Sequence, residues 1–171
     1  MHLKPLSLSH VSPRYVAWLN DEQVNRYLET RWQEQTIDTV LKYVDQSLKD
    51  PGVRIFAILE MAKGERHIGN IKIGPTNERH QYADLSYLIG EKECWGKGYA
   101  TEAIKLACEY AFKVMKLHRL RAGLYAKNEA SRRALVRNGF VHEGTFAREL
   151  KFGETWQDHL WFGKNCERLS L

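Results

Sequence analysis

The feature that most constrains the fold is a run of small residues, Gly96-Lys97-Gly98-Tyr99-Ala100, placed between a predicted strand and a predicted helix. The strand is expected over residues 83–89, and the helix continues to about residue 116 because apolar side chains recur on one of its faces. A strand over residues 118–125 and a helix over 129–137 follow. Alternating strands and helices imply parallel pairing within a mixed sheet, so the pattern predicts an α/β fold. The apolar face consists of Ile104, Ala107, Cys108, Ala111 and Met115.

The first fifty residues read as helical, and the middle of the chain reads as strands. Ser12-Pro13 is typical of a helix start, and the helical stretch over residues 15–28 breaks near Asn20-Asp21. Strands over residues 53–60 and 67–73 flank a predicted turn, Ala62-Lys63-Gly64-Glu65, and a closing hairpin is expected over residues 141–152 and 155–163. A second helix is expected after Thr36, because the following residues have helical spacing: Ile37, Val40, Leu41, Val44 and Leu48.

Length and composition exclude several classes of protein. The 171 residues suit one domain that spans residues 1–171. No apolar run is longer than five residues, the length of the run from Ile55 to Leu59, whereas a membrane helix needs about 20, so no membrane partner is expected. The N-terminus lacks the long apolar segment of a secretory signal, and three Cys without CxxC spacing suit free thiols, so a cytoplasmic location is expected. The seven His show no metal-ligand spacing, and no metal is predicted.

The Gly-rich run also suggests a binding site for phosphate. Small residues at Gly96, Gly98 and Ala100 let a ligand reach the main chain. The helix that follows leaves its first N–H groups without internal partners, and these groups attract anions together with the helix dipole. Lys92 and Lys97 add positive charge nearby. A loop that only turns the chain would show the same short pattern.

The wider stretch over residues 95–112, WGKGYATEAIKLACEYAF, resembles the acetyl-CoA-binding motif of the GCN5-related N-acetyltransferases (GNAT). The usual form of that motif is Q/R-x-x-G-x-G/A, and here Trp95 takes the first position. Asn128-Glu129-Ala130-Ser131 and Arg137-Asn138-Gly139-Phe140 are similar to elements of the RimJ/RimL-like branch, which acetylates the N-termini of ribosomal proteins. Residues 18–29, 143–144 and 156–158 are also similar to that branch, so the resemblance covers nearly the whole chain.

This resemblance implies a fold, a cosubstrate and a binding mode. The fold would be a twisted mixed sheet of about six to seven strands, with flanking helices and a central parallel pair that splays apart. Acetyl-CoA would lie in that splay, with its pantetheine beside the strand over residues 83–89 and its pyrophosphate on the Gly-rich run. Relatives often dimerise, so the resemblance leaves a homodimer open. The cofactor-binding residues that it implies are Leu88, Ile89, Gly96, Lys97, Gly98, Tyr99, Ala100, Thr101 and Asn128.

Transfer of acetyl to an amine needs a neutral amine and a proton for the leaving thiolate. Many family members supply that proton from a Tyr at the position that Leu135 occupies here. The resemblance therefore assigns the role to Ser131, the Ser of the branch motif, with Tyr125 in reserve. It also assigns the amine proton to Asp84, at an acidic position common in the branch. The alternatives are that Ser131 only supports its helix and that Asp84 is solvated or ion-paired.

The acceptor is expected to contact the segment around residues 29–34. Trp32 offers an aromatic wall there, Arg31 a cation, and Glu29 and Glu34 two carboxylates. The resemblance favours a protein N-terminus, whose ammonium group one of these carboxylates would hold before it loses its proton.

Other functions stay open from the sequence. An amino-sugar nucleotide would need Arg31 and Arg79 to hold its phosphates. Polyamine or antibiotic acetylation is a further option, and a CoA-binding module without catalysis belongs to another class. Nucleic-acid binding is the weakest alternative, because the net charge of +5 arises from scattered basic residues.

Overall fold

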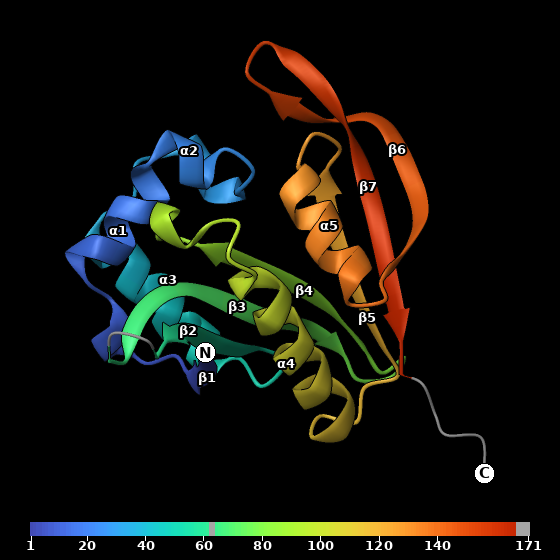
Figure 1. Ribbon diagram of the computed structural model, residues 1–171, viewed down its shortest axis with the longest axis horizontal. Helices are drawn as coiled ribbons and strands as arrows, with labels where there is room; N and C mark the ends of the chain where they lie inside the picture. Colours follow the sequence, from blue (N-terminus) through green and yellow to red (C-terminus); the bar gives the residue numbers. More distant parts are fainter. Residues whose placement is uncertain (62–63, 167–171) are drawn as a thin grey trace.

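The computed structural model describes residues 1–61 and 64–166 and shows a seven-stranded sheet with helices on both faces (Figure 1). The strand order is β1-β2-β3-β4-β5-β7-β6. The strands are β1 (His2–Pro5), β2 (Arg54–Glu60), β3 (Arg66–Asn77), β4 (Tyr82–Ile89), β5 (Arg119–Tyr125), β6 (Val141–Phe152) and β7 (Thr155–Asn165). The helices are α1 (Pro13–Asn20), α2 (Glu22–Asn25), α3 (Ile37–Lys49), α4 (Tyr99–Lys113) and α5 (Glu129–Arg137). Short 3-10 turns are η1 (Leu8–His10), η2 (Glu29–Trp32) and η3 (Lys92–Cys94).

A short parallel pair joins the two halves of the sheet. Within the described residues, β4 and β5 are in register at Tyr82–Arg119, Ala83–Leu120 and Asp84–Arg121, whereas the other neighbouring strands are antiparallel. Beyond this joint β4 continues along β3, and β5 continues along β7. The two central strands therefore diverge, which confirms the predicted α/β fold with a splayed parallel pair.

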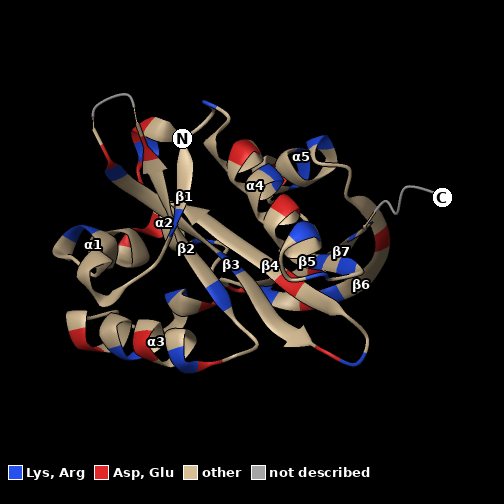
Figure 2. Ribbon diagram, turned by 90° about the horizontal axis from the view of Figure 1, so that it is seen from below, with Lys and Arg blue, Asp and Glu red and all other residues tan. Residues whose placement is uncertain are grey.

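Helices lie on both faces of the sheet (Figure 2), and each face carries a hydrophobic core. α4 and α5 cover one face, where Ile104 and Leu135 are buried among strand residues. α1 and α3 cover the other face, where Trp18 and Val44 pack against β2. No helix within the described residues is long and apolar enough to span a membrane.

The helix starts follow the polar residues that the sequence places before them. Ser12 accepts a hydrogen bond from the Tyr15 N–H at 3.3 Å, with Pro in the first turn of α1. Asp21 ends α1 and caps α2, and Thr36 caps α3. The predicted helix starts, and the break near Asn20-Asp21, are thus confirmed, because each cap satisfies N–H groups that the first turn leaves free.

Two expectations for the first half of the chain were wrong. The first fifty residues are not all helical, because β1 pairs antiparallel with β2 at the edge of the sheet. Four residues are too few to show strand alternation. The predicted apolar face of α3 is also narrower than expected: Val40 and Val44 are buried, whereas Ile37 and Leu48 are 38% and 46% exposed. Ala62 and Lys63 of the predicted turn lie outside the described residues.

Candidate active site

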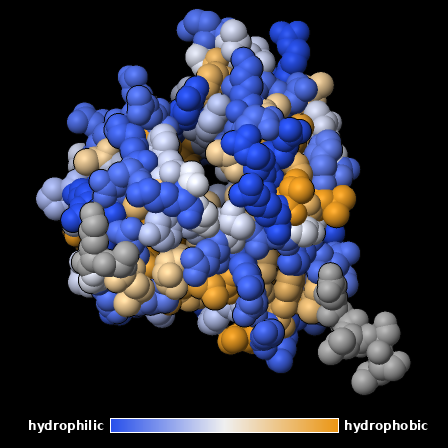
Figure 3. All heavy atoms as spheres, viewed as in Figure 1, coloured by the Kyte–Doolittle hydropathy of each residue, from blue (hydrophilic) through white to orange (hydrophobic). Residues whose placement is uncertain are grey.

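Where β4 and β5 diverge, their edges border a large cleft. Residues 85–89 of β4 and 122–125 of β5 line it, and its volume is about 1300 Å³. Figure 3 shows the opening as a hollow in the surface. Because the two edges no longer pair with each other, both can offer main-chain groups to a ligand, as edge strands do. Leu88 and Ile89, predicted to border the cofactor, both line this cleft.

Two glycines shape the loop between β4 and α4. Gly96 and Gly98 have φ angles of 74° and 88°, in the region that favours glycine, and open space lies where a side chain would be. α4 begins at Tyr99, so its first N–H groups have no partner inside the helix. Among the described residues no acceptor contacts the N–H groups of residues 96–101. This loop therefore fits the phosphate oxygens of acetyl-CoA. Its cleft-lining residues are Gly96, Gly98, Tyr99, Ala100 and Thr101, while Lys97 is exposed outside the cleft.

Trp95, at the first position of the motif, makes a polar contact of its own. Its indole Nε1 donates a hydrogen bond to the carbonyl oxygen of Ile89 at 2.8 Å. The indole thus ties the last residue of β4 to the loop, and its ring remains 43% exposed at the cleft. The Ile89 carbonyl therefore already accepts one hydrogen bond, and its second lone pair remains for another donor.

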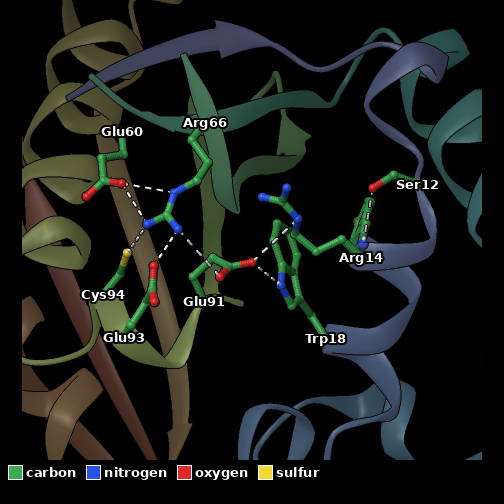
Figure 4. Close-up of polar contacts among 9 residues, drawn as sticks. Ser12, Arg14, Trp18, Glu60, Arg66, Glu91, Glu93 and Cys94 are labelled. Atoms are coloured by element: carbon green, nitrogen blue, oxygen red, sulfur yellow. Dashed lines mark hydrogen bonds and ion pairs between the residues drawn. The ribbon is translucent and has the colours of Figure 1, made fainter. Parts of the chain in front are cut away.

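Arg66 of β3 supports the loop through carboxylates from several elements (Figure 4). Its guanidinium pairs with Glu60 of β2 at 2.6 Å, with Glu91 at 3.9 Å, and with Glu93 of η3. Glu60 also accepts a hydrogen bond from the Tyr99 hydroxyl at 2.6 Å, and this bond raises the pKa of Tyr99 to about 12. Sequence reasoning missed this cluster because its members are far apart along the chain.

The same loop is fixed against α1. Trp18 donates from Nε1 to Glu91 at 3.0 Å, and its ring leaves no room for a Cβ at Gly90. Lys92, predicted to add charge near phosphate, instead pairs with Asp21 at 2.6 Å. The loop is therefore held in place from two sides, with its free N–H groups directed by the glycines.

α5 brings Asn128 and Ser131 to the cleft. The Asn128 side chain accepts a hydrogen bond from the Ser131 N–H at 3.2 Å and so caps the helix. Tyr87 of β4 donates to the Ser131 carbonyl at 3.3 Å, and burial raises the pKa of Tyr87 to about 12. Leu135 is 1% exposed and belongs to the core. The Ser131 hydroxyl, for its part, has no hydrogen-bond partner within the described residues, so it is available to a ligand.

Asp84 does not lie at the cleft. It occupies the last registered position of β4 with β5, and its carboxylate pairs with Arg121 at 2.7 Å. The Arg121 guanidinium also lies over the rings of Tyr82 and Trp161, 4.2 and 5.2 Å from their centres. Since the strands diverge only beyond this point, Asp84 is absent from the residues that line the cleft. In this structure the carboxylate joins the two strands through Arg121, and the base role of Asp84 stays a prediction that this position does not favour.

Arg31 joins η2 to the hairpin of β6 and β7. Its guanidinium donates to the carbonyls of Leu28 at 2.8 Å and Lys151 at 2.9 Å, and to the Tyr125 hydroxyl at 2.6 Å. It also stacks over the Trp32 ring, 4.2 Å from its centre. With its side chain only 12% exposed, Arg31 is committed to these contacts and is not free to hold a phosphate.

Glu29 and Tyr125 form a hydrogen-bonded pair beside the cleft. The Tyr125 hydroxyl donates to Glu29 at 2.7 Å, and the Trp32 indole donates to the same carboxylate at 3.1 Å. Burial alone would raise the pKa of Glu29, but these bonds and the charge of Arg31 lower it below its usual range. Burial, followed by the bond to Glu29, raises the pKa of Tyr125. Glu29 lines the cleft, whereas Arg31, Trp32, Glu34 and Arg79 are not among its lining residues.

The part of the cleft bordered by α2, α3 and β3 carries cations and amides. Arg26, Lys42 and Lys72 line it, and none of them has a carboxylate partner among the described residues. Asn70 lines it as well; it is 4% exposed, and its Nδ2 has no hydrogen-bond partner there. Its Oδ1 contacts His67 Nε2 at 2.9 Å. Sequence reasoning did not single out these residues, because they look like ordinary surface positions of a helix and a strand.

A histidine on β7 also borders the cleft. His159 lines it, and its Nδ1 contacts Glu149 of β6 at 2.5 Å. Sequence reasoning considered the histidines only as metal ligands and so passed over this one. Within the described residues no group of three or more His, Cys, Asp or Glu is placed to hold a metal ion.

Comparison with known sequences shows the family of this chain. A family model described as acetyltransferase (GNAT) domain matches residues 1–141. The chain is 40% identical over 79 residues to the probable N-acetyltransferase YjcK of Bacillus subtilis, and these residues make up 46% of this chain and 43% of that protein. It is 30% identical over 152 residues to the spermidine N(1)-acetyltransferase of Escherichia coli K12, and this alignment covers 86% of this chain and 76% of that protein. The chain therefore belongs to the GNAT acetyltransferase family.

Solved structures share the fold over almost the whole chain. Spermidine N-acetyltransferase from Vibrio cholerae, in complex with CoA and spermine, superposes with a TM-score of 0.85 at 22% identity and covers 96% of this chain and 94% of that chain. RimJ from Mycobacterium smegmatis, in complex with CoA-disulfide, gives a TM-score of 0.81 at 20% identity over 99% and 83% of the two chains. At these identities the likeness shows the fold, and the RimJ/RimL-like branch stays a prediction. Together with the family, the site defines an acetyl-CoA-dependent N-acetyltransferase.

Proposed function

We propose that the protein acetylates the α-amino group of a peptide or protein, and that it prefers acceptors with acidic side chains near that amine. The observation that carries this proposal is the charge of the cleft wall. Among the described residues, five lining residues are Lys or Arg and one is a carboxylate, Glu29. Glu29 already accepts hydrogen bonds from Tyr125 and Trp32. The five cations are Arg26, Lys42, Lys72, Arg133 and Arg137.

A cationic wall favours an acceptor that brings negative charge and hydrogen-bond acceptors. Two like charges 4 Å apart repel by about 4 kcal/mol at an effective dielectric constant of about 20, so a polycation would bind poorly beside Lys42 and Lys72. A peptide supplies carbonyl oxygens, and the unpartnered Nδ2 of Asn70 is a donor that such an oxygen would satisfy. An α-amino group, with a pKa of about 7.7–8.0, is also partly neutral near pH 7.

A polyamine is the second candidate acceptor. The observation that favours it is the 30% identity to a spermidine N(1)-acetyltransferase over 86% of this chain. Such an acceptor would depend on Glu29, the one carboxylate among the described lining residues. The cations Lys42 on α3 and Lys72 on β3 would therefore attract an acidic peptide and repel a polyamine.

A panel of acceptors separates the two candidates. Thiol release from acetyl-CoA is measured with spermidine and with two peptides that share the N-terminal residue, one acidic and one basic at the next positions. We expect kcat/KM to be highest for the acidic peptide, and Lys72→Glu to reverse the order of the two peptides. Lys105→Glu, on α4 and outside this cleft, is the matched control. Higher kcat/KM for spermidine than for every peptide would overturn the peptide proposal.

Ser131 is proposed to protonate the leaving thiolate. The support is its place at the cleft on the first turn of α5 and a hydroxyl without another partner among the described residues. The proton can pass from this hydroxyl to the thiolate while solvent replaces it. Tyr125 is less suited, since its hydroxyl proton already lies toward Glu29.

Two further proposals concern the oligomeric state of the enzyme and its cellular compartment. A homodimer is supported by the position of β6 at the edge of the sheet, because the main chain of an edge strand can pair with a second copy, and by Val141 and Phe146, which are 64% and 54% exposed. Light scattering on the purified protein tests this. A reducing compartment such as the cytoplasm is supported by the free thiols of Cys94, Cys108 and Cys166.

A further inference from the structure

His159 and Glu149 form a carboxylate–imidazole pair at the edge of the cleft. The His159 Nδ1 lies 2.5 Å from a Glu149 carboxylate oxygen. A carboxylate accepts hydrogen bonds, so this contact favours the tautomer of the neutral ring that donates from Nδ1 and has its lone pair on Nε2. The imidazole side chain is 19% exposed, and the residue lines the cleft.

Gly123 of β5 makes room for this ring. A Cβ at Gly123 would lie 2.4 Å from the His159 Nε2 and 3.2 Å from its Cε1. The absence of a side chain thus lets the imidazole lie directly against the divergent part of β5. Trp161 and Phe146 hold the ring from other sides, with centroids 5.0 and 6.4 Å away. Nε2 has no hydrogen-bond partner among the described residues, and His159 lines the cleft.

The other candidate bases near the cleft are occupied. Asp84 is paired with Arg121 outside the cleft. Glu29 accepts from both Tyr125 and Trp32, and its lowered pKa makes it a weak base. The charged and titratable groups that face the His159 ring are Glu149 on β6, Glu29 on η2 and Tyr125 on β5.

We propose that His159, oriented by Glu149, is the general base that takes the proton from the acceptor amine. The amine nitrogen forms a bond to the acetyl carbonyl carbon as its N–H proton passes to Nε2 of His159. The carbon–sulfur bond breaks, its electron pair leaves with the CoA sulfur, and that sulfur takes a proton from the Ser131 hydroxyl or solvent. The imidazolium then returns its proton to water. This assignment rests on the proposed acetyl transfer, but it holds for a peptide or a polyamine acceptor alike.

Kinetics of matched histidine variants test the assignment. His159→Gln should lower kcat by about 100-fold, near the lower end of what general base catalysis contributes. Glu149→Gln should lower it less, and its remaining activity should rise with pH as more amine becomes neutral. His142→Gln, an exposed histidine on the neighbouring strand, is the control and should behave as wild type. Acetyl-CoA affinity by calorimetry should be unchanged in all three, since the loop over residues 96–101 is untouched.

If His159→Gln folds poorly, a second variant and a direct measurement test the proposal in its place. Gly123→Ala should displace the ring and lower kcat at unchanged acetyl-CoA affinity. In the wild type, NMR should show the His159 ring resonances shifting on addition of acceptor, while those of His142 stay fixed. The proposal is overturned if His159→Gln keeps kcat within twofold of wild type, or if the His159 resonances do not respond. Failure of the peptide proposal alone would appear as activity on spermidine that still depends on His159.

Discussion

The cofactor side and the acceptor side of the cleft are built on different principles. On the proposed cofactor side, the lining residues come mainly from one short stretch of chain, residues 85–101, and glycines set the direction of its main-chain groups. On the proposed acceptor side, side chains from α2, η2, α3, β3, β6 and β7 come together. The first arrangement depends on local conformation, whereas the second depends on the packing of distant segments.

This difference indicates which changes each side tolerates. Main-chain N–H groups do not depend on side-chain identity, so the cofactor side is sensitive mainly to substitutions that alter φ or block access. The acceptor side can change its ligand through single side chains such as Lys72, without any change in the fold. Binding of acetyl-CoA and choice of acceptor should therefore respond to different sets of mutations.

The largest expected effect is on the chemical step. Ser131→Ala should lower kcat by about 10²–10⁴-fold, the range typical of a general acid, while acetyl-CoA affinity stays the same. Ser131→Thr, which keeps the hydroxyl, should recover much of the loss. Steady-state kinetics with calorimetry provide the check. A twofold loss in Ser131→Ala would limit this residue to its helix and leave protonation to water.

A second substitution tests the cofactor side alone. Gly98→Val should weaken acetyl-CoA binding by about 100-fold, because it strains a φ of 88° and fills the space beside the free N–H groups. Gly153→Val is the matched control, since Gly153 also has a positive φ, 58°, and open space, but lies in the turn between β6 and β7. Calorimetry that finds equal affinity in both variants would contradict the phosphate-binding role of the loop.

Arg31→Ala tests the acceptor side. The variant loses three hydrogen bonds from one guanidinium, so we expect about 2 kcal/mol less unfolding free energy and an acceptor KM raised by about tenfold. Acetyl-CoA affinity should not change. Arg79→Ala, in the loop between β3 and β4, should leave both quantities as in the wild type. If acetyl-CoA affinity falls along with acceptor binding, the two sides are not as separate as we propose.

The smallest expected effect is the pH dependence of stability that comes from His67, whose Nε2 contacts the Asn70 side chain. Burial lowers the pKa of His67 below its usual 6.5, so the unfolded chain binds more protons than the folded one below that pH. The free energy of unfolding should therefore fall as pH drops below about 6.5, by about 1.4 kcal/mol for each unit by which the pKa is lowered. Denaturation at several pH values measures this slope, which should be smaller in His67→Gln. An unchanged slope would assign the pH dependence to other groups.

The same contrast explains what the sequence could predict. The strand, loop and helix over residues 82–113 follow from local patterns, because glycine positions, caps and apolar spacing all act within a few residues. The ion pair of Asp84 could not be predicted in this way, because its partner Arg121 lies on another strand and meets it only across the joint between β4 and β5. Likewise, Arg31 looked like a free cation until the β6–β7 hairpin supplied it with the Lys151 carbonyl.

His159 illustrates the same point. Alone, a histidine in a predicted strand carries no signal of function. Its importance arises from Glu149, ten residues earlier along the chain, and from the missing side chain at Gly123 on the adjacent strand. Only strand register brings the three together, and register depends on the whole sheet.

The three-residue joint between β4 and β5 has a consequence for the dynamics of the chain. Few main-chain hydrogen bonds hold β1–β4 to β5–β7, so local opening at this seam costs less free energy than global unfolding. If acetyl-CoA binds across the seam as we propose, it should stabilise the closed form according to its concentration and affinity. Amide hydrogen exchange along β4 and β5 should therefore slow when the cosubstrate is present, while exchange in β1 and β2 changes little. Bound acetyl-CoA would thus supply, between β4 and β5, contacts that the two strands do not make with each other beyond their three registered pairs.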